Sequence, residues 1–251
     1  MRNADQTEDG LSRSANGSAE RFGVHGSAVA LPDWSDLPRL RPWTRWRFPD
    51  GPTSGARDLW TLQSQAAYAS LQSLGVLRQT AEHADPEFAS AYQWMSAQMR
   101  RRLHTPPTAF PIWFWTRADW KWVAREVRSS RETPSVLLHV RKPQEQVLVS
   151  DFVDWHHVLN GALHVPAYGI EHERPDIYWA RAEPEFDSWD LAVARGASSQ
   201  REWRTWPASL RRSLEASWEH IFDPRTWAPG SALQAVAWEL QAHEVVKAIR
   251  R

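Results

Sequence analysis

The chain has 251 residues, of which 42 % are hydrophobic and 24 % charged, so it suits one sizeable domain and is not disordered along its whole length. Lys and Arg total 30 and balance 30 Asp and Glu. The chain therefore lacks the net positive charge expected of a dedicated duplex-DNA binder. Cysteine is absent from the sequence, and this excludes a disulfide framework, a thiolate metal site and a cysteine nucleophile.

Neither a membrane segment nor an export signal is recognisable in the sequence. No apolar run approaches the roughly 18 residues that a membrane-spanning helix needs. The N-terminal residues carry acidic side chains and lack the apolar centre of a secretory signal. We therefore expect a cytoplasmic protein without a membrane partner, and the balanced charge gives no strong sign of a nucleic-acid partner.

Tryptophan is the outlier of the composition, with 17 residues, and some of these lie in a proline-rich segment near the N-terminus. Residues 1–30 are rich in Ser, Gly and Asn and predict a disordered tail. Residues 31–57 hold Trp34, Trp43 and Trp46 among prolines, which disfavour helix and predict an extended arm. We expect the arm to lie on the domain by its indoles; the alternative is that it docks on a partner protein.

The single globular domain is expected to comprise residues 58–251, and its first elements are a strand and two helices. Alternating apolar and polar residues over 59–63 predict the strand. Ser64 at the N-cap and Gly75 at the C-terminus bound a predicted helix between them. An aspartate followed by proline starts the second helix, which carries on one face Phe88, Tyr92, Met95 and Met99.

Three further strands and a short helix are predicted in the middle of the chain. The aromatic run over residues 110–115 predicts a buried strand. Residues 135–140 and 146–152 predict two more, which the proline-containing turn between them would join into a hairpin. Asp154 as N-cap predicts a helix that ends near Asn160.

The C-terminal part is expected to contain a long loop followed by two helices. Residues 165–206 are polar and show no sustained periodicity, which predicts a long variable loop. Helical spacing of apolar residues predicts helices over 207–222 and 231–249. Together the elements predict an α+β fold, with a mixed or antiparallel sheet flanked by helices and two helices at the C-terminus.

The densest polar cluster lies where the strand at 146–152 passes into the following helix. Asp151 and His156 are residue types of general acid–base catalysis, and Asn160 offers an amide to a ligand. The alternative is that Asp151 or Asp154 caps the helix while His156 fills an interior hydrogen-bonding position.

The histidines of this region do not form a recognisable metal-binding pattern. The candidate ligands are His156, His157, His164 and the cluster Glu171, His172 and Glu173. Adjacent histidines on one helix point about 100 degrees apart and rarely ligate one ion together. We therefore predict no metal site.

Further candidates are a late carboxylate and a set of ligand-binding side chains. Glu219 follows Trp218, and a carboxylate beside a buried indole is a candidate catalytic group with a raised pKa; an exposed acid is the alternative. Indoles offer stacking surfaces to a base or a nicotinamide ring, although core packing explains aromatic residues equally well. The ligand-binding candidates besides Asn160 are Trp60, Thr61, Gln63, Tyr92 and Trp113.

Several motifs together resemble a bacterial family described as a domain of unknown function (DUF3841). They are LWTLQS from Leu59, AYQWM from Ala91, PIWFW from Pro111, VSDF from Val149 with WHHVLN from Trp155, and SWEHIF from Ser217. The resemblance covers about residues 59–250 with the same motif order. It implies an intact family domain and does not imply an activity.

The order of the elements is also loosely similar to the layout of small ADP-ribosyltransferase-like domains. Those domains hold NAD in a cleft between two short sheets and usually rely on a late glutamate, so the resemblance makes NAD a candidate cofactor and Glu219 the candidate glutamate. Thr61 and Gln63 stand on the opening strand, where those domains usually carry Arg or His. This departure concerns catalysis more than fold.

Three hypotheses about function follow. The first is an enzyme-like domain that binds a nucleotide or similar small molecule, with Asp151, His156 and Glu219 at one pocket. The second is an ADP-ribosyltransferase-like protein that uses NAD. The third is a non-enzymatic protein-interaction module that uses exposed tryptophans. Convergence of the three catalytic candidates would favour the first hypothesis, and burial of the indoles would weigh against the third.

Overall fold

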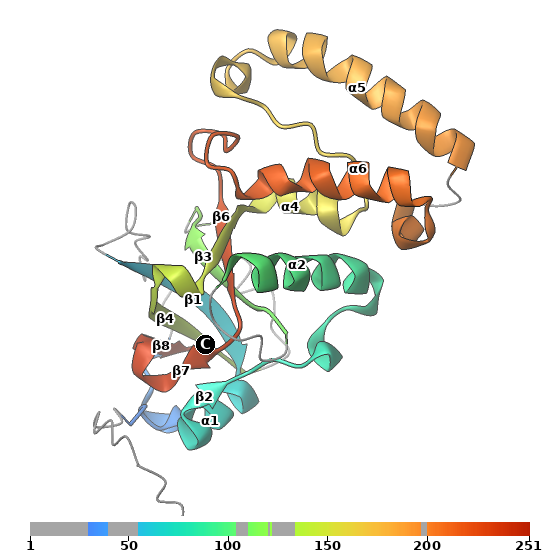
Figure 1. Ribbon diagram of the computed structural model, residues 1–251. Helices are drawn as coiled ribbons and strands as arrows, with labels where there is room; N and C mark the ends of the chain where they lie inside the picture. Colours follow the sequence, from blue (N-terminus) through green and yellow to red (C-terminus); the bar gives the residue numbers. More distant parts are fainter. Residues whose placement is uncertain (1–29, 40–54, 104–109, 120, 122–133, 197–199) are drawn as a thin grey trace, which may run out of the picture.

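The computed structural model describes residues 30–39, 55–103, 110–119, 121, 134–196 and 200–251 (Figure 1). Its centre is an antiparallel six-stranded sheet in the order β5-β6-β3-β1-β4-β8. These strands are β1 (Ala56–Ser64), β3 (Ile112–Arg117), β4 (Ser135–Pro143), β5 (Leu148–Asp151), β6 (Leu233–Ala237) and β8 (Val245–Arg250). A small sheet pairs β2 (Val76–Leu77) with β7 (Leu240–Gln241). The helices are α1 (Gln65–Leu74), α2 (Ala89–Arg102), α4 (Phe152–Leu159), α5 (Pro175–Gly196) and α6 (Ala208–Trp218), and the α+β class is confirmed.

The large sheet consists of two halves that meet at one place. β1 pairs with β4 along all 9 of its residues. By contrast, the pairing of β1 with β3 is recorded only between Trp60 and Trp115, within the described chain. β3 continues its own half by pairing with β6, and β6 pairs with β5. The sheet is therefore split between the half β5-β6-β3 and the half β1-β4-β8.

Local signals around the first helix behave as the sequence predicts. The Ser64 hydroxyl accepts a hydrogen bond from the Ala67 N–H at 3.1 Å. Gly75 adopts φ of 71°, a left-handed conformation in which glycine avoids the steric cost of a Cβ atom. α1 is thus confirmed with both of its ends, and it places its buried residues Tyr68 and Leu71 against the sheet.

Two large apolar clusters lie on opposite faces of the sheet, and a smaller third cluster consists of Trp60, Leu137 and Ile249. On one face, α1 and the small sheet pack on a cluster that includes Leu59, Phe114 and Leu138. On the other face, α2, α4 and α6 bury a tryptophan-rich cluster against β5 and β6. Figure 1 shows these three helices on the same side of the molecule, with α5 outermost beyond α6. Burial of this much indole surface makes the helices and the sheet one core.

The predicted hairpin between residues 135 and 152 is wrong. β4 lies between β1 and β8, whereas β5 lies at the opposite edge of the sheet beside β6. The two strands are neighbours in sequence, but their partners come from distant parts of the chain. Sequence proximity favours a hairpin, and tertiary pairing overrides it here.

The predicted helix over residues 231–249 is also wrong, because this segment forms β6, β7 and β8. All residues of β6 are buried, since it lies between β5 and β3 and is covered on both faces. A strand buried on both faces reads as a continuous apolar run, which periodicity cannot distinguish from a buried helix. The other predicted C-terminal helix, over 207–222, is confirmed as α6 and a following 3₁₀ turn.

The segment 165–206, predicted as a long loop, contains α5. Ala182 is the only residue that the structure gives as buried in this helix, so its sequence carries little apolar periodicity. α5 is attached by hydrogen bonds from Tyr178 Oη to the Val165 carbonyl at 3.0 Å and from Arg181 Nη2 to Glu171 Oε2 at 2.7 Å. Trp189 and Val193 of α5 also pack against the tryptophan-rich cluster, but these few apolar residues form no sustained stripe, so the sequence pattern did not predict the helix.

The described part of the N-terminal arm lies on the domain. Tyr68 Oη donates a hydrogen bond to the Pro32 carbonyl at 2.8 Å, and Trp34 packs near the Tyr68 ring. The predicted disordered tail, apart from residue 30, and both Trp43 and Trp46 are outside the described residues. Among the tryptophans that the structure describes, Trp179 alone is exposed, which removes most support from the interaction-module hypothesis.

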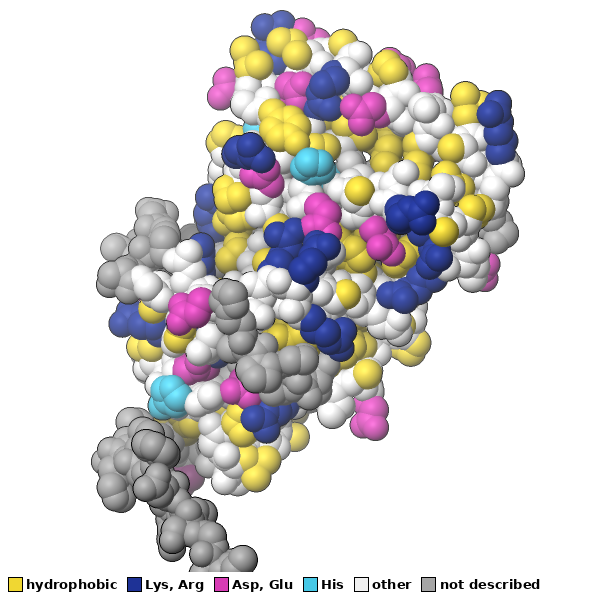
Figure 2. Space-filling view, in the orientation of Figure 1, with side chains coloured by type: hydrophobic (Ala, Val, Ile, Leu, Met, Phe, Trp, Pro, Cys, Tyr) yellow, Lys and Arg dark blue, Asp and Glu magenta, His cyan; other side chains and the backbone are white. Residues whose placement is uncertain are grey.

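The surface shows mixed charge. Figure 2 shows acidic and basic side chains interspersed over the face in view, in keeping with the balanced composition. In the part of the chain that the structure describes, no helix is both long and apolar enough to cross a membrane.

Candidate functional site

A pocket of about 220 Å³ opens at the split between the two half-sheets. We call it the split-sheet pocket; its lining residues are Thr61, Leu62, Gln63, Gln79, Trp113, Phe114, Trp115 and Gln234. They come from β1, β3 and β6 and from the chain after β2. The pocket therefore draws its walls from both halves of the sheet.

Amide and hydroxyl groups lie beside indoles in this pocket. Gln63 Nε2 donates a hydrogen bond to Thr61 Oγ1 at 2.7 Å, and both side chains are buried. Gln234 Nε2 donates to Ser150 Oγ at 3.3 Å. These contacts fix the orientation of two primary amides whose groups can both donate and accept hydrogen bonds.

A larger hollow of about 550 Å³ continues from the split-sheet pocket toward α1 and β2. The two share Leu62, Gln63 and Gln79 as lining residues. Arg78 lines the larger hollow and is half-exposed, with an ion pair of 2.9 Å to Glu239. Together the pocket and the hollow reach the size range of small-molecule sites.

Three of the predicted ligand-binding residues, Thr61, Gln63 and Trp113, line the split-sheet pocket. Trp60 does not line it; its ring stacks on His139 with centroids 4.6 Å apart. Trp60 belongs instead to a small apolar cluster with Leu137 and Ile249. Its burial therefore reflects packing.

The other two predicted ligand-binding residues lie away from this pocket. Tyr92 packs edge-on against Trp113 with ring centroids 6.1 Å apart. Asn160 is exposed at the end of α4, where its Nδ2 donates to the His156 carbonyl at 2.7 Å. Neither residue lines the split-sheet pocket.

Asp151 is the N-cap of α4. Its Oδ1 accepts hydrogen bonds from the N–H groups of Val153 at 2.7 Å and Asp154 at 3.1 Å. The sequence offered either Asp151 or Asp154 as the N-cap of this helix. The structure shows that Asp151 is the N-cap. His156 is exposed, with its Nδ1 2.9 Å from the Phe152 carbonyl, so it fills no interior position.

Glu219 lies at the end of α6 and faces the C-terminal turn of α2. It accepts hydrogen bonds from Gln98 at 2.8 Å and from Arg101 and Arg102. Burial alone would raise the pKa of Glu219, but the bonds from Arg101, Gln98 and Arg102 together lower it. The raised pKa expected from the sequence is thus corrected.

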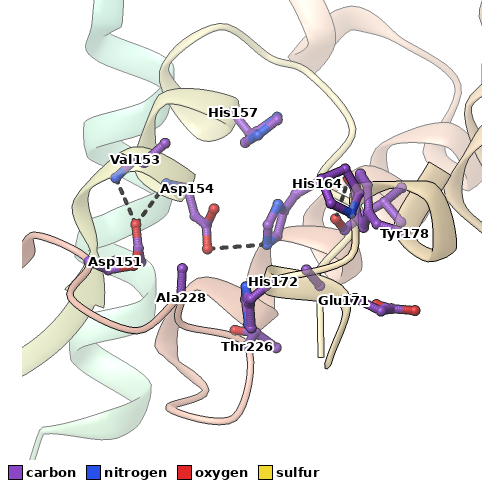
Figure 3. A pocket seen from close by; sticks show the side chains of 14 residues that line it. Asp151, Val153, Asp154, His157, His164, Glu171, His172, Tyr178, Thr226 and Ala228 are labelled. Atoms are coloured by element: carbon purple, nitrogen blue, oxygen red, sulfur yellow. Dashed lines mark hydrogen bonds and ion pairs between the residues drawn. The ribbon is translucent and has the colours of Figure 1, made fainter. Parts of the chain in front are cut away.

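The three catalytic candidates do not line one common pocket. Asp151 lines a pocket beside α4, which Figure 3 shows, and neither His156 nor Glu219 is among the lining residues of that pocket. Convergence at one site was the observation that would favour the first hypothesis. The placement of these residues gives that hypothesis no support.

The pocket beside α4, which we call the α4 pocket, has a volume of about 340 Å³. Its polar lining includes Asp151, Asp154, His157, His164, Glu171 and His172. In Figure 3, Asp154 and His164 point toward one another, and His157 projects from α4 above them. Asp154 Oδ2 lies 3.7 Å from His164 Nε2.

Burial shifts the titration of these groups in opposite directions. Desolvation, with a smaller effect of Asp151, raises the pKa of Asp154 to about 7. Desolvation and the neighbouring His157 and His220 lower the pKa of His164 to about 3. Both pKa shifts therefore favour the neutral form, for the Asp154 carboxyl and for the His164 imidazole.

The sequence did not single out Asp154 as a partner of the histidines. Of the adjacent histidines His156 and His157, only His157 belongs to the cluster with Asp154 and His164. Asp154 and His157 are three residues apart and share one helix face, and this spacing was the available signal. His164 joins them through the chain reversal after α4, which the sequence alone does not reveal.

The fold and its pockets define an α+β domain with a split antiparallel sheet. Residues 58–246 match the family described as Domain of unknown function (DUF3841), and the chain belongs to this family. No curated protein and no solved structure matches the chain.

Proposed function

We propose that this domain binds an NAD-type dinucleotide, with the nicotinamide end in the split-sheet pocket. The observation that carries the proposal is the position of this pocket between two half-sheets that meet at a single described residue pair. The resemblance to ADP-ribosyltransferase-like domains leads us to expect NAD in a cleft between two short sheets. The location of the pocket agrees with that expectation.

The chemistry of the lining suits a flat aromatic amide. Trp113 and Trp115 line the pocket, and indoles attract a cationic aromatic ring such as the oxidised nicotinamide. Gln63 and Gln234 carry primary amides that can pair with the carboxamide of the ligand through complementary donors and acceptors. An aromatic carboxamide would use both kinds of group at once.

The adjoining hollow gives the rest of a dinucleotide a place to lie. It shares Gln63 with the split-sheet pocket and extends along the length of α1, from Ser64 past Leu74 to Arg78. Helix N-termini and guanidinium groups both favour phosphate oxygens. We therefore assign the diphosphate to the region between α1 and Arg78.

The proposal is one of binding and does not include group transfer. None of the eight lining residues that the structure gives for the split-sheet pocket carries a carboxylate. Glu219 is the candidate glutamate of the resemblance to ADP-ribosyltransferase-like domains. It is instead hydrogen-bonded to arginines at the end of α2. The group transfer of ADP-ribosyltransferase-like domains would need a carboxylate at the pocket.

Isothermal titration of the full chain with NAD⁺ and with free nicotinamide tests this proposal. Gln234→Leu removes a pocket amide, and Gln98→Leu is a matched control because both side chains are 4 % exposed. We expect one site for NAD⁺ and a loss of about tenfold in affinity for Gln234→Leu, the equivalent of one hydrogen bond. Gln98→Leu should bind normally.

Two outcomes would contradict the proposal. One is the absence of saturable binding by the folded wild-type chain. The other is an equal loss of affinity in both variants, which would mean that Gln234 acts through general stability. Circular dichroism of each variant establishes that it is folded before titration.

A further inference from the structure

Three potential metal ligands converge beside α4, outside the split-sheet pocket. Asp154 and His157 lie three residues apart on α4 and so share one face of the helix. His164 reaches them from the connection that follows. One ligand atom from each of the three side chains lies within 4.8 Å of the other two.

The His164 imidazole is the feature that points to a ligand. Its side chain is 4 % exposed, and neither ring nitrogen has a hydrogen-bond partner in the described part of the chain. The Asp154 oxygen at 3.7 Å is too distant for a hydrogen bond. Buried polar atoms are nearly always satisfied, so a group that binds His164 would remove a substantial cost.

His157 lies beside His164 and near a backbone carbonyl. The carbonyl of Leu163 is close enough to interact with its ring. A histidine that donates one ring N–H to a carbonyl holds its other nitrogen ready for a metal ion. The ring of His157 lies close to that of His164, with centroids 5.0 Å apart.

The donor set indicates which ions fit. Two imidazole nitrogens and one carboxylate oxygen suit divalent first-row transition metals such as Zn²⁺ better than Mg²⁺ or Ca²⁺, which prefer oxygen alone. The carboxylates of Asp151 and Glu171 also line this pocket, but Asp151 caps α4 and Glu171 is paired with Arg181, so we assign neither as a ligand. Three protein ligands leave one position of a tetrahedral ion for a small molecule.

We propose that Asp154, His157 and His164 bind a divalent transition metal ion of the Zn²⁺ type, with its fourth position facing the α4 pocket. None of the three residues lines the split-sheet pocket, so the two sites are distinct and can be tested separately. The ion would connect α4 to the segment that leads into α5. It would thereby stabilise the folded state by its binding free energy.

Metal titration of the full chain, free of any affinity tag and treated with a chelator, tests the site. Zn²⁺ binding is followed by calorimetry, and Co²⁺ binding by visible absorption. The variants are Asp154→Asn and His164→Gln, with His156→Gln as the matched control. His156 is the neighbouring histidine on the same helix and lies outside the cluster.

We expect one Zn²⁺ per chain, a Co²⁺ absorption of the tetrahedral type, and a Zn²⁺-dependent rise in melting temperature. Each ligand variant should bind at least about 100-fold more weakly, since even outer-shell changes cost 10 to 100-fold. His156→Gln should bind like the wild type. If His164→Gln is unfolded, Asp154→Asn decides, because that side chain is 20 % exposed.

The proposal is overturned if the folded wild-type chain binds no stoichiometric Zn²⁺. It is also overturned if Asp154→Asn retains wild-type affinity, or if His156→Gln loses affinity as much as the ligand variants do. In the last two cases the ion would be held by other groups.

Discussion

Trp60 on β1 and Trp115 on β3 form the residue pair at which the two halves of the six-stranded sheet meet, and no other pair is recorded between these strands in the described chain. The halves are otherwise built by long pairings, β1 with β4 and β3 with β6. A sheet joined this narrowly can hold a ligand between its halves without losing the pairings that stabilise each half. The proposed nucleotide site lies at this junction.

Arg78→Gln should distinguish the contribution of the diphosphate to binding from that of the nicotinamide. We expect NAD⁺ to bind about tenfold more weakly, because a charge-assisted hydrogen bond to phosphate is lost. Free nicotinamide should bind as it does to the wild type. Titration of both ligands measures this difference. An equal effect on NAD⁺ and nicotinamide would mean that Arg78 does not contact the diphosphate.

Glu219→Gln should affect stability and leave NAD⁺ binding unchanged. The side chain joins the end of α6 to Arg101 and Arg102 of α2 and is about one-third exposed. For such a partly exposed pair we expect a loss of about 1 kcal/mol in the free energy of unfolding. Urea denaturation measures the loss. Abolished NAD⁺ binding by a stably folded variant would show that Glu219 contacts the ligand.

Lys142 and Glu244 form a buried ion pair that should be intolerant of single changes. Lys142 Nζ donates to both carboxylate oxygens at 2.6 Å, and the side chains are 1 % and 5 % exposed. Lys142→Met leaves an unpaired buried carboxylate and should cost about 3–5 kcal/mol.

The double variant Lys142→Met, Glu244→Gln should recover part of that loss, because no unpaired charge remains. Urea denaturation of the three proteins provides the comparison. A single variant as stable as the wild type would mean that the carboxylate is solvated.

The attachment of α5 should weaken in acid. The hydrogen bond from Arg181 lowers the pKa of Glu171 from 4.5 to about 2. A lowered folded-state pKa means that this stabilisation is present above pH 4.5 and is lost as the pH falls toward 2. Wild type should therefore melt above Glu171→Gln at pH 6, and the difference should vanish near pH 2. A difference that grows in acid would contradict this assignment.

Short-range signals in the sequence predicted the local structure well. Ser64 and Gly75 mark the ends of α1, and the side chains that cause these ends adjoin the helix itself. The α+β class and the helix α2 likewise follow from local patterns. Pairing partners did not follow, because β5 and β8 find their neighbours far along the chain.

The candidate sites were predicted in part. Thr61, Gln63 and Trp113 were identified from strands that were correctly predicted. Gln234 was missed because its segment was read as a helix, whereas it lies on the central strand β6. His164 was considered as a metal ligand. Its approach to Asp154 depends on the chain reversal after α4, which local sequence patterns do not predict.

The most direct test of nucleotide binding at the split sheet uses the tryptophans themselves. Selective ¹⁵N labelling gives an indole N–H signal for each of the 17 tryptophans, and substitution by Phe assigns those of Trp113, Trp115 and Trp179. On addition of NAD⁺ we predict saturable shifts at Trp113 and Trp115, with Trp179 unmoved. Signals of Trp113 and Trp115 that stay fixed at saturating NAD⁺ would contradict the proposed function.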